Sequence, residues 1–461
     1  MATNNRLIIV SNRVAKPKRG AKAAGGLTVG ILGALKDAGG VWFGWNGKLT
    51  SRDSRDAQLS EIDNISFATI DLNRQDYEAY YNGFSNRSLW PLLHHLLGFF
   101  SFSRSEFEGY LRVNATFARK LVPLLQPDDI IWVHDYHLIP LAAELRKAGV
   151  KNPIGFFLHV PFPGYDMLQS LPNHDYLIRS MCAYDVVGFH TQRDLASFRE
   201  AVTQPAIGGE LKAGNRVSVG GGTLRADVFP IGIDVREVAN LARETFDNRQ
   251  VREMRDSLNG RDMLIGVDRL DYSKGLQLRF RAYERLLENH PAHRKHLTLM
   301  QIAPPTRVGV RAYDEIRSEL EQASGQINGR FADANWVPIR YLNKGFARAT
   351  LMGFFRSAAV GLVTPVRDGM NLVAKEYVAS QNPESPGMLV LSELAGAAYE
   401  LDAAVLVNPY DIDDVADGIN RALVMPLEER QERHAAMMAI LRQNDITAWR
   451  QRFVAALTTS N

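Results

Sequence analysis

Two cationic side chains, Arg269 and Lys274, follow an apolar run in the segment DRLDYSKGL. Cations beside a helix-capping Ser273, where a strand passes into a helix, can hold a diphosphate, because backbone amides and charged side chains both bind phosphate oxygens. The segment lacks the pattern GxxxxGK[ST] and is therefore not a P-loop. The alternative is a solvated cluster in which the neighbouring aspartates, Asp268 and Asp271, pair with the two cations.

A turn and a helix start follow in the segment TPVRDGMNLVAKE (364–376). Asp368 and Gly369 turn the chain and leave backbone amides available at the start of the helix, and Glu376 comes two turns along it. A carboxylate in that place can accept hydrogen bonds from both hydroxyl groups of a ribose. The alternative is a capped helix with an exposed glutamate, which the spacing by itself leaves open.

Polar side chains also end two apolar runs in the N-terminal half. His134, Asp135 and His137 follow the run DIIWV, and His159 closes the run IGFFLHV. The two histidines of the first group lack a third ligand at a metal-site spacing, so a hydrogen-bonding cluster is favoured over a metal site. Asp135 can then hold sugar hydroxyls or orient a basic group. His159 belongs either to this site or to the core as a satisfied histidine.

Glycines and an arginine near the N-terminus form another candidate for anion binding. Arg13 follows the first apolar run, and Gly25 and Gly26 precede a helical pattern. Amides at a helix N-terminus favour an anionic group, whereas the alternative is a plain turn with a helix cap.

Metal and redox sites find less support. The segment DID at 411–413 has the spacing of a D-x-D metal motif, but acidic residues directly before a helical run are typical of a helix cap. Cys182 is the single cysteine, which excludes an intrachain disulfide, a zinc ribbon and a CxxC redox site. We expect a buried, structural thiol.

The elements that would position these residues alternate between short apolar runs and longer helical patterns. Near-continuous apolar runs are typical of parallel strands covered on both faces, and their alternation with helices predicts doubly wound α/β sheets. Strands are expected at 6–11, 41–45, 65–70, 129–135, 154–160 and 185–190, and in a second series at 263–268, 297–303, 337–342, 358–363, 388–392 and 404–408. Helices are expected at 27–36, 112–125, 141–148 and 428–443, a long helical stretch near 235–258, and a hairpin at 215–229.

Two series of strands predict two Rossmann-like domains that face a central cleft, at residues 1–234 and 235–461. Ligands of such sheets bind at the carboxyl ends of the strands, which is where the candidate residues fall. For the last helix, around Trp449, we allow for packing back on the first domain.

Composition limits the classes of function. In 461 residues, 54 Lys and Arg against 51 Asp and Glu leave a net charge of +3, too small an excess for a dedicated nucleic-acid or membrane-surface binder. The first residues are too poor in apolar side chains for a signal peptide, and the sequence has no apolar run near 18 residues. We therefore expect a cytoplasmic protein.

Several longer motifs identify a family. They are SNRVA (11–15), AGGL (24–27), GGVWFGWNG (39–47), EAYYNGFSNRSLWP (78–91), IIWVHDYHLIP (130–140), DRLDYSKGL (268–276), QIAPPTR (301–307) and TPVRDGMNLVAKEYVA (364–379). From about residue 6 to the C-terminus the sequence resembles the bacterial trehalose-6-phosphate synthases, retaining glycosyltransferases of family 20 with the GT-B architecture. The resemblance implies transfer of glucose from a nucleotide-diphosphate glucose, usually UDP-glucose, to glucose 6-phosphate, which gives α,α-trehalose 6-phosphate.

The same resemblance assigns roles to residues, motif by motif. Acceptor binding is implied for Arg13, Tyr81, Trp90, Asp135 and Arg307. Donor binding is implied for Gly25, Gly26, His159, Arg269, Lys274, Phe346, Asp368, Gly369, Met370, Asn371, Leu372, Val373 and Glu376. The catalytic set is Arg269, Lys274, Asp135, His159 and Asp368, with neither a metal nor a cofactor.

The mechanism that the resemblance implies is substitution on the face from which the diphosphate leaves. The leaving oxygen takes the proton of the acceptor hydroxyl, and Arg269 and Lys274 stabilise the charge that a metal balances in D-x-D enzymes. A glucosylglycerol-phosphate synthase and a catalytically silent sugar-phosphate sensor are the alternatives. The identity of the nucleotide and the oligomeric state, a homo-oligomer included, stay open.

Overall fold

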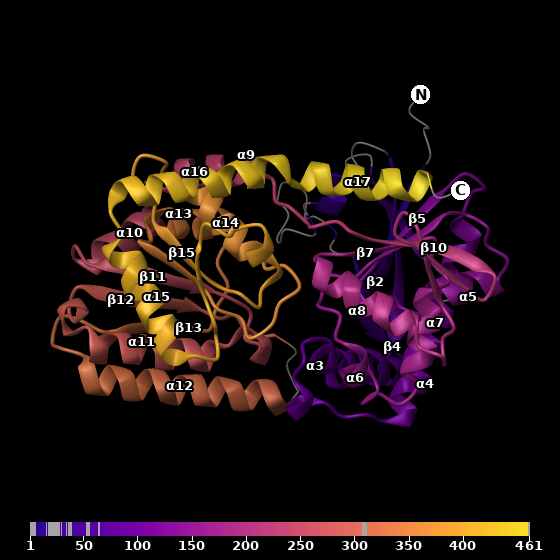
Figure 1. Ribbon diagram of the computed structural model, residues 1–461, viewed down its shortest axis with the longest axis horizontal. Coiled ribbons are helices and arrows are strands. Elements are labelled where there is room, and N and C mark those ends of the chain that lie inside the picture. The colour runs from indigo at the N-terminus through magenta and orange to yellow at the C-terminus, as the bar shows by residue number, and fades with distance from the viewer. Residues whose placement is uncertain are drawn as a thin grey trace. The chain divides into compact units, whose positions relative to one another are not determined.

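The computed structural model describes residues 6–14, 16, 28, 30–33, 35, 39–51, 56–62, 65–306 and 311–459. The chain forms two compact units (Figure 1): Met1–Pro230 with Thr447–Asn461, and Ile231–Ile446. It therefore passes from one unit to the other twice. The sequence predicts a boundary between the domains after Asp234, whereas the two units divide after Pro230.

The described part of the first unit is built on a ten-stranded sheet in the order β3-β4-β2-β1-β5-β6-β7-β10-β9-β8. The strands from β4 to β10 are parallel, and β3, β9 and β8 add antiparallel edges. Burial of every residue in Ile130–His134 and in the first five residues of β1 explains why these strands are apolar throughout. The strands are β1 (Leu7–Arg13), β2 (Gly40–Thr50), β3 (Gln58–Ile62), β4 (Ile65–Asn73), β5 (Ile130–His134), β6 (Ile154–Phe157), β7 (Val186–Phe189), β8 (Glu210–Lys212), β9 (Arg216–Val219) and β10 (Gly222–Val228).

Helical segments of this unit connect the strands, and the last of them comes from the C-terminal end of the chain. They are α2 (Arg74–Tyr77), the π-helical η1 (Glu78–Leu89), α3 (Trp90–Leu93), η2 (Leu97–Phe99), α4 (Arg104–Leu121), η3 (Val122–Leu124), η4 (Tyr136–Leu138), α5 (Leu141–Lys147), α6 (Tyr165–Leu168), α7 (His174–Met181), α8 (Gln192–Val202) and α17 (Ile446–Thr458).

The second unit is built on a six-stranded, fully parallel sheet in the order β13-β12-β11-β14-β15-β16. Helices α11 and α12 lie on one side of it, and α9, α13 and α14 lie on the other (Figure 1). The elements are α9 (Val235–Thr245), α10 (Arg249–Leu258), β11 (Asp262–Val267), η5 (Tyr272–Lys274), α11 (Leu276–Asn289), η6 (Pro291–His293), β12 (Leu297–Ile302), α12 (Arg311–Phe331), β13 (Ile339–Leu342), α13 (Arg348–Ser357), β14 (Val360–Val363), α14 (Leu372–Ser380), β15 (Met388–Ser392), η7 (Gly396–Tyr399), β16 (Val405–Val407), α15 (Ile412–Val424) and α16 (Leu427–Gln443).

The two sheets share one topology. Numbered along each parallel series, the first unit (β1, β2, β4, β5, β6, β7) and the second (β11 to β16) both have the order 3-2-1-4-5-6. This is the doubly wound Rossmann order, whose ligands bind where the order reverses. The rule points to the carboxyl ends of β1 and β5 in the first unit and of β11 and β14 in the second.

Most of the elements that the sequence predicts are confirmed. Each expected strand is present, most of them with somewhat different ends, and β9 and β10 form the expected hairpin. The long helical stretch expected near 235–258 is present as two helices, α9 and α10, because Asn248 caps a new helix between them. The expected helix at 27–36 lies partly outside the described residues. Helix α12 and the π-helical η1 were not predicted.

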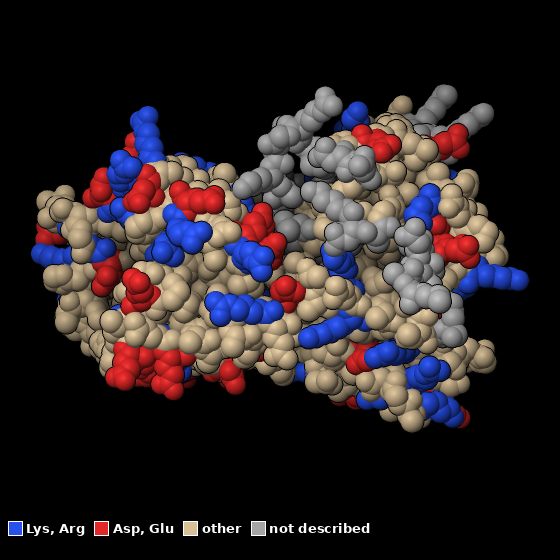
Figure 2. All heavy atoms as spheres, turned by 90° about the horizontal axis from the view of Figure 1, so that it is seen from above, with Lys and Arg blue, Asp and Glu red and all other residues tan. Residues whose placement is uncertain are grey.

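Two general expectations concern the surface. Among the described residues, no helix is both long and apolar enough to cross a membrane. On the face that Figure 2 shows, Lys and Arg side chains are interspersed with Asp and Glu, in keeping with a net charge of +3.

Candidate functional site

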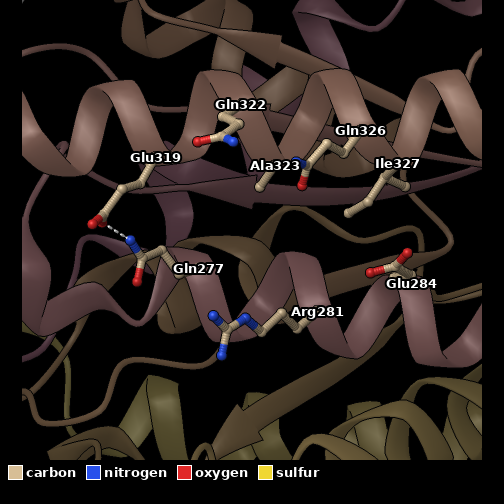
Figure 3. A pocket seen from close by; sticks show the side chains of 8 residues that line it. All are labelled: Gln277, Arg281, Glu284, Glu319, Gln322, Ala323, Gln326 and Ile327. Carbon is tan, nitrogen blue, oxygen red and sulfur yellow. Dashed lines mark hydrogen bonds between the residues drawn. The ribbon is translucent and has the colours of Figure 1, made fainter.

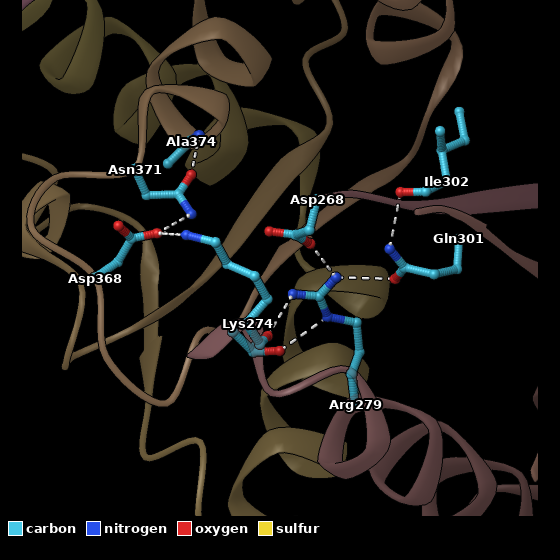
Figure 4. Close-up of polar contacts among 9 residues, drawn as sticks. Asp268, Lys274, Arg279, Gln301, Ile302, Asp368, Asn371 and Ala374 are labelled. Atoms are coloured by element: carbon cyan, nitrogen blue, oxygen red, sulfur yellow. Dashed lines mark hydrogen bonds and ion pairs between the residues drawn. The ribbon is translucent and has the colours of Figure 1, made fainter. Parts of the chain in front are cut away.

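The carboxyl ends of β11 and β14 bring a lysine and an aspartate into contact. Lys274 Nζ lies 2.5 Å from Asp368 Oδ2, and Asn371 Nδ2 donates to the same oxygen at 3.0 Å (Figure 4). The Asn371 side chain also accepts from the Ala374 amide at 3.2 Å, and so caps α14. The structure thus joins two segments that the sequence offered as separate candidates.

A buried arginine contacts the segments that carry this pair. Arg279 on α11 is fully buried, and Gly266 leaves room for it, since a Cβ at that position would lie 2.6 Å from Arg279 Nη1. Its guanidinium donates to the Asp268 carboxylate at 2.6 Å, the Gln301 side chain at 2.8 Å, the Thr364 hydroxyl at 3.0 Å and the Lys274 carbonyl at 3.5 Å (Figure 4). One side chain therefore ties the loop after β11 to both β12 and the end of β14.

The expected helix cap in the loop after β11 is wrong, and the alternative pairing of Asp268 with Lys274 is not observed. Ser273 does not cap the helical turn η5, because its buried Oγ has no hydrogen-bond partner and the Asp271 carboxylate accepts from the Ser273 amide. Asp268 does not serve to neutralise Lys274, because it pairs with Arg279 and Lys274 pairs with Asp368.

The remaining donor candidates lie around this pair. Arg269 is exposed directly after Asp268. Gly369 and Met370 are buried in the turn before α14, while Leu372 and Val373 are partly exposed in its first turn. The amides at the N-terminus of this nine-residue helix carry a partial positive charge that favours an anion.

Two further donor candidates lie near the start of α13. The Phe346 ring packs edge-on against Phe354 at 5.3 Å, and Lys344 Nζ lies 5.2 Å from its centre. Glu376, in the second turn of α14, contacts Arg348 Nε at 3.3 Å. Burial raises the pKa of Glu376, and Arg348 opposes that rise.

In the first unit, Asp135 follows β5 directly and has an unusual backbone. Its φ of 77° and ψ of 165° fall in a region that costs a residue other than glycine about 1–3 kcal/mol. The Phe157 carbonyl accepts from the Asp135 amide at 2.8 Å, and Asp135 Oδ1 accepts from the His159 amide at 3.2 Å. The strained backbone therefore brings Asp135 and His159 together, as a functional site would require.

His159 lies beyond the end of β6 and pairs with another histidine. His134 Nδ1 and His159 Nε2 are 3.0 Å apart, so one ring donates to the other. Burial lowers the pKa of His159 to about 3, and burial together with His159 lowers the pKa of His134 well below its usual value. Both rings are neutral near pH 7. The side chain of His159 is half-buried.

Aromatic rings surround the other acceptor candidates. Arg13 is exposed at the end of β1, with its guanidinium carbon 5.7 Å from the centre of the Trp45 ring. The centre of the Tyr81 ring lies 6.4 Å from that of Trp45 and 5.7 Å from that of His137, on which it stacks. Gly47, beside this guanidinium, has a φ of 89°, a conformation that favours glycine.

Trp90 is buried at the start of α3, 5.7 Å from the ring of Tyr136, which follows Asp135. The structure thus connects Trp90 with Asp135 through a neighbour in sequence. The candidates Gly25, Gly26 and Arg307 lie outside the described residues.

Two metal alternatives receive no support from the described residues. His137 stacks on Tyr81 while His134 contacts His159, so the pair is not arranged around one point. In the part of the chain that the structure describes, no three His, Cys, Asp or Glu side chains could hold a metal together. Asp411 caps α15 by accepting from the Asp413 and Asp414 amides, which confirms the cap. Cys182 is only partly buried, and burial raises its pKa to about 12.

Sequence reasoning missed Arg279, His134 as a partner of His159, and Arg348. For Arg279 a signal exists: it shares one helix face with Leu276, Phe280 and Tyr283, where the spacing predicts an apolar residue. For the other two, their neighbours come from distant parts of the chain and no local pattern marks them.

A groove lies between α11 and α12, away from all these residues (Figure 3). It has a volume of about 330 Å³ and is lined mainly by polar side chains, among them Gln277, which donates to Glu319. None of the candidate residues lines it.

Comparison with known proteins gives a consistent result. The model of glycosyltransferase family 20 matches residues 2–459. The chain is 50% identical over 454 residues to a trehalose-6-phosphate synthase of Enterobacter sp. (strain 638), which covers 98% of this chain and 95% of that protein. A UDP-forming α,α-trehalose-phosphate synthase from Burkholderia vietnamiensis has a similar fold, with a TM-score of 0.96 and 51% identity over 99% of both chains. For the enzyme from Burkholderia xenovorans in complex with glucose-6-phosphate, the TM-score is 0.95 and the identity 51%, over 98% of this chain and all of that one.

Proposed function

Because the chain belongs to glycosyltransferase family 20, we propose that it transfers glucose from UDP-glucose to glucose 6-phosphate. The product is α,α-trehalose 6-phosphate, formed with retention at the anomeric carbon of the donor. Both substrates are metabolites of the cytoplasm, and the proposal places the reaction there.

The observation that carries the proposal is the cluster at the carboxyl ends of β11 and β14. The Lys274 ammonium lies there 2.5 Å from Asp368, which also accepts from Asn371 at the N-terminus of α14, and the exposed Arg269 precedes Lys274 in the same loop. Fixed positive charge and helix amides are what a leaving diphosphate requires. Asp368 and Asn371 supply acceptors and a donor for sugar hydroxyls in the same place.

In the proposed reaction the donor is held by the second unit. Arg269, Lys274 and the first amides of α14 bind the diphosphate and stabilise the charge that develops as the glycosidic bond breaks. Asp368 holds hydroxyls of the glucose, Phe346 lies against the base and Glu376 accepts from the ribose. The departing diphosphate oxygen takes the proton of the attacking hydroxyl on the same face, so retention follows without a covalent intermediate.

Most of the residues assigned to the acceptor belong to the first unit, whereas Arg307 falls within residues 231–446 of the second. Arg13 and Arg307 bind the phosphate of glucose 6-phosphate, since guanidinium groups match phosphate oxygens. Tyr81 and Trp90 line the sugar, and Asp135 accepts from a hydroxyl. His159, neutral because its pKa lies at about 3, acts on the transferred glucose as a hydrogen-bonding group and not as a cation.

The test is proton NMR of the purified protein with glucose 6-phosphate and, in turn, UDP-, GDP- and ADP-glucose, with EDTA present. The expected result is an α,α-linked disaccharide phosphate with UDP-glucose. Product with glycerol 3-phosphate in place of glucose 6-phosphate would instead assign the protein to the glucosylglycerol-phosphate synthases. The absence of product with either acceptor would contradict catalysis and favour a sugar-phosphate sensor.

A further inference from the structure

Three helices of the second unit meet around one guanidinium. Arg348, the first residue of α13, places Nη1 2.6 Å from Glu237 Oε2 on α9 and Nε 3.3 Å from Glu376 Oε1 on α14. In Figure 1 these helices lie together on one side of the sheet. The side chains of Arg348 and Glu376 are 13% and 12% exposed, and that of Glu237 is 31% exposed. One cation is therefore shared between two carboxylates in a largely buried place.

The shared cation bears directly on the charge of Glu376. Burial raises the pKa of this carboxyl, Arg348 lowers it, and the negative charge of Glu237 raises it. The two neighbours thus act in opposite directions on the same group. The guanidinium fork also fixes Glu376 in space, because it holds one carboxylate oxygen while its other nitrogen is anchored on α9.

Several other charged side chains near α14 have partners of their own. On α14 itself, Lys375 pairs with Glu400 and donates to the Ile231 carbonyl. On α13, Arg356 donates to the Ser380 carbonyl and lies over Phe246, and on α9 Arg243 contacts Asn240. On α16, His434 contacts the Val378 carbonyl and Arg430 donates to the Pro386 carbonyl. Strands β14 and β15 contribute no charged side chain to this side.

The charge of Glu376 matters because of the ligand that the proposed function assigns to it. An ionised carboxylate is an acceptor only, and can accept from both hydroxyls of a ribose. When it is protonated, one oxygen becomes a donor and one of those hydrogen bonds is lost.

We propose that Arg348 and Glu237 are positioning residues that set the charge and orientation of Glu376, and so determine how tightly the ribose of the donor is bound. This inference rests on the proposed function, because it takes Glu376 as the group that binds ribose.

The experiment is calorimetric titration of UDP-glucose into the full-length protein, without acceptor, from about pH 5 to about pH 9, a range that spans the ordinary carboxyl values upward. The diphosphate of UDP-glucose is esterified at both ends and does not titrate in this range, so a loss of affinity on the acid side reports on the protein. We compare wild type with Arg348→Met, Glu237→Gln and Arg348→Lys. Arg243→Met, an exposed arginine on α9, is the matched control.

In Arg348→Met, the pH at which the affinity for UDP-glucose falls by half on the acid side is expected to rise by about 1–3 units, because the positive charge near the Glu376 carboxyl is removed. In Glu237→Gln it should move to lower pH, because the repulsion is removed and the guanidinium serves Glu376 alone. Arg348→Lys should lie between wild type and the methionine variant, and Arg243→Met should match wild type. With dUDP-glucose, which lacks the ribose 2′-hydroxyl, every protein should show a weaker dependence on pH.

Three results would overturn the inference: an unshifted midpoint in Arg348→Met, shifts of the same sign in Arg348→Met and Glu237→Gln, or a uniform loss of affinity at every pH. Each would indicate that the three residues serve the fold alone. Failure of the wild type to bind UDP-glucose would contradict the proposed function instead. Circular dichroism spectra that match wild type show that a variant has folded.

Discussion

The two sheets have one strand order, yet the residues at their equivalent edges differ in kind. In the second unit the carboxyl ends of the strands carry two ion pairs, Lys274 with Asp368 and Arg279 with Asp268. In the first unit the strand ends carry single charged residues, Arg13 and Asp135, among aromatic and imidazole rings, and His159 contacts His134 with the pKa values of both imidazoles lowered. A leaving diphosphate needs fixed charge, whereas an attacking hydroxyl needs orientation, and the same topology serves both.

The buried ion pair of the second unit gives the largest expected effect. Arg279→Met should lower the free energy of unfolding by about 3–5 kcal/mol, because it leaves the Asp268 carboxylate buried without its counter-ion. Urea denaturation measures the loss. The double variant Arg279→Met/Asp268→Asn should recover part of it, and Arg249→Met, which removes an exposed ion pair with Glu253, should show no loss. Equal losses of unfolding free energy in Arg279→Met and Arg249→Met would show that the buried ion pair contributes no more than the exposed one.

Lys274, the buried lysine at these strand ends, should affect turnover strongly. Lys274→Met should lower kcat by about 10²- to 10³-fold, the range seen when one group that stabilises developing charge is removed. The KM for glucose 6-phosphate should change little. Lys295→Met, a surface lysine of the same unit that pairs with Asp333, is the control. A larger change in that KM than in kcat would place Lys274 at the acceptor instead.

The neutral histidines of the first unit should make stability fall in acid. In the folded state the pKa of His159 is lowered to about 3 and that of His134 is also lowered, so below an unfolded value of about 6.5 the unfolded chain binds protons that the folded chain does not. The free energy of unfolding should therefore decrease by up to ~1.4 kcal/mol per pH unit for each histidine as the pH falls below about 6.5. Urea denaturation at several pH values gives the slope. His159→Gln should reduce it, and an unchanged slope would show that other groups cause the loss.

The smallest effect separates two buried tryptophans, one from each unit. Trp449 Nε1 in the first unit has no hydrogen-bond partner, whereas Trp336 Nε1 in the second donates to the Leu297 carbonyl at 2.8 Å. Replacement by phenylalanine should therefore cost about 1 kcal/mol more at Trp336, because a hydrogen bond is lost there and none is lost at Trp449. Urea denaturation of the two variants tests this. A greater loss at Trp449 would contradict the difference in hydrogen bonding.

The sequence predicts the sheets well for a simple reason. Strands such as Ile130–His134 are buried on both faces, so every residue is apolar or satisfied and the run stands out. Helix α12 does not stand out, because Gly325 and Gly329 weaken its helical pattern. Packing stabilises it nevertheless, through the buried residues Ile316, Leu320 and Ile327.

For the candidate site too, local sequence patterns predict some features and not others. Residues at strand ends, such as Asp135 and Lys274, can be selected from the order of apolar and polar residues. Contacts between distant segments cannot, because no local pattern shows that Lys274 meets Asp368 or that Arg348 lies between Glu237 and Glu376. The backbone conformation of Asp135 is also invisible in a sequence, since aspartate at a positive φ is uncommon.

The chain returns from the second unit to the first after Ile446, which affects the order in which the two units become complete. Trp449 and Phe453 of α17 pack against Trp132 at 4.9 and 4.6 Å, in the unit that the ribosome begins first. Residues 231–446 are contiguous in the sequence, whereas the first unit combines residues before 231 with residues after 446. In the order of synthesis, the first unit is therefore complete only after the whole of the second unit has been made. Until α17 is synthesised, the apolar rings of Trp132 and Phe157 lack the contacts that Trp449 and Phe453 provide.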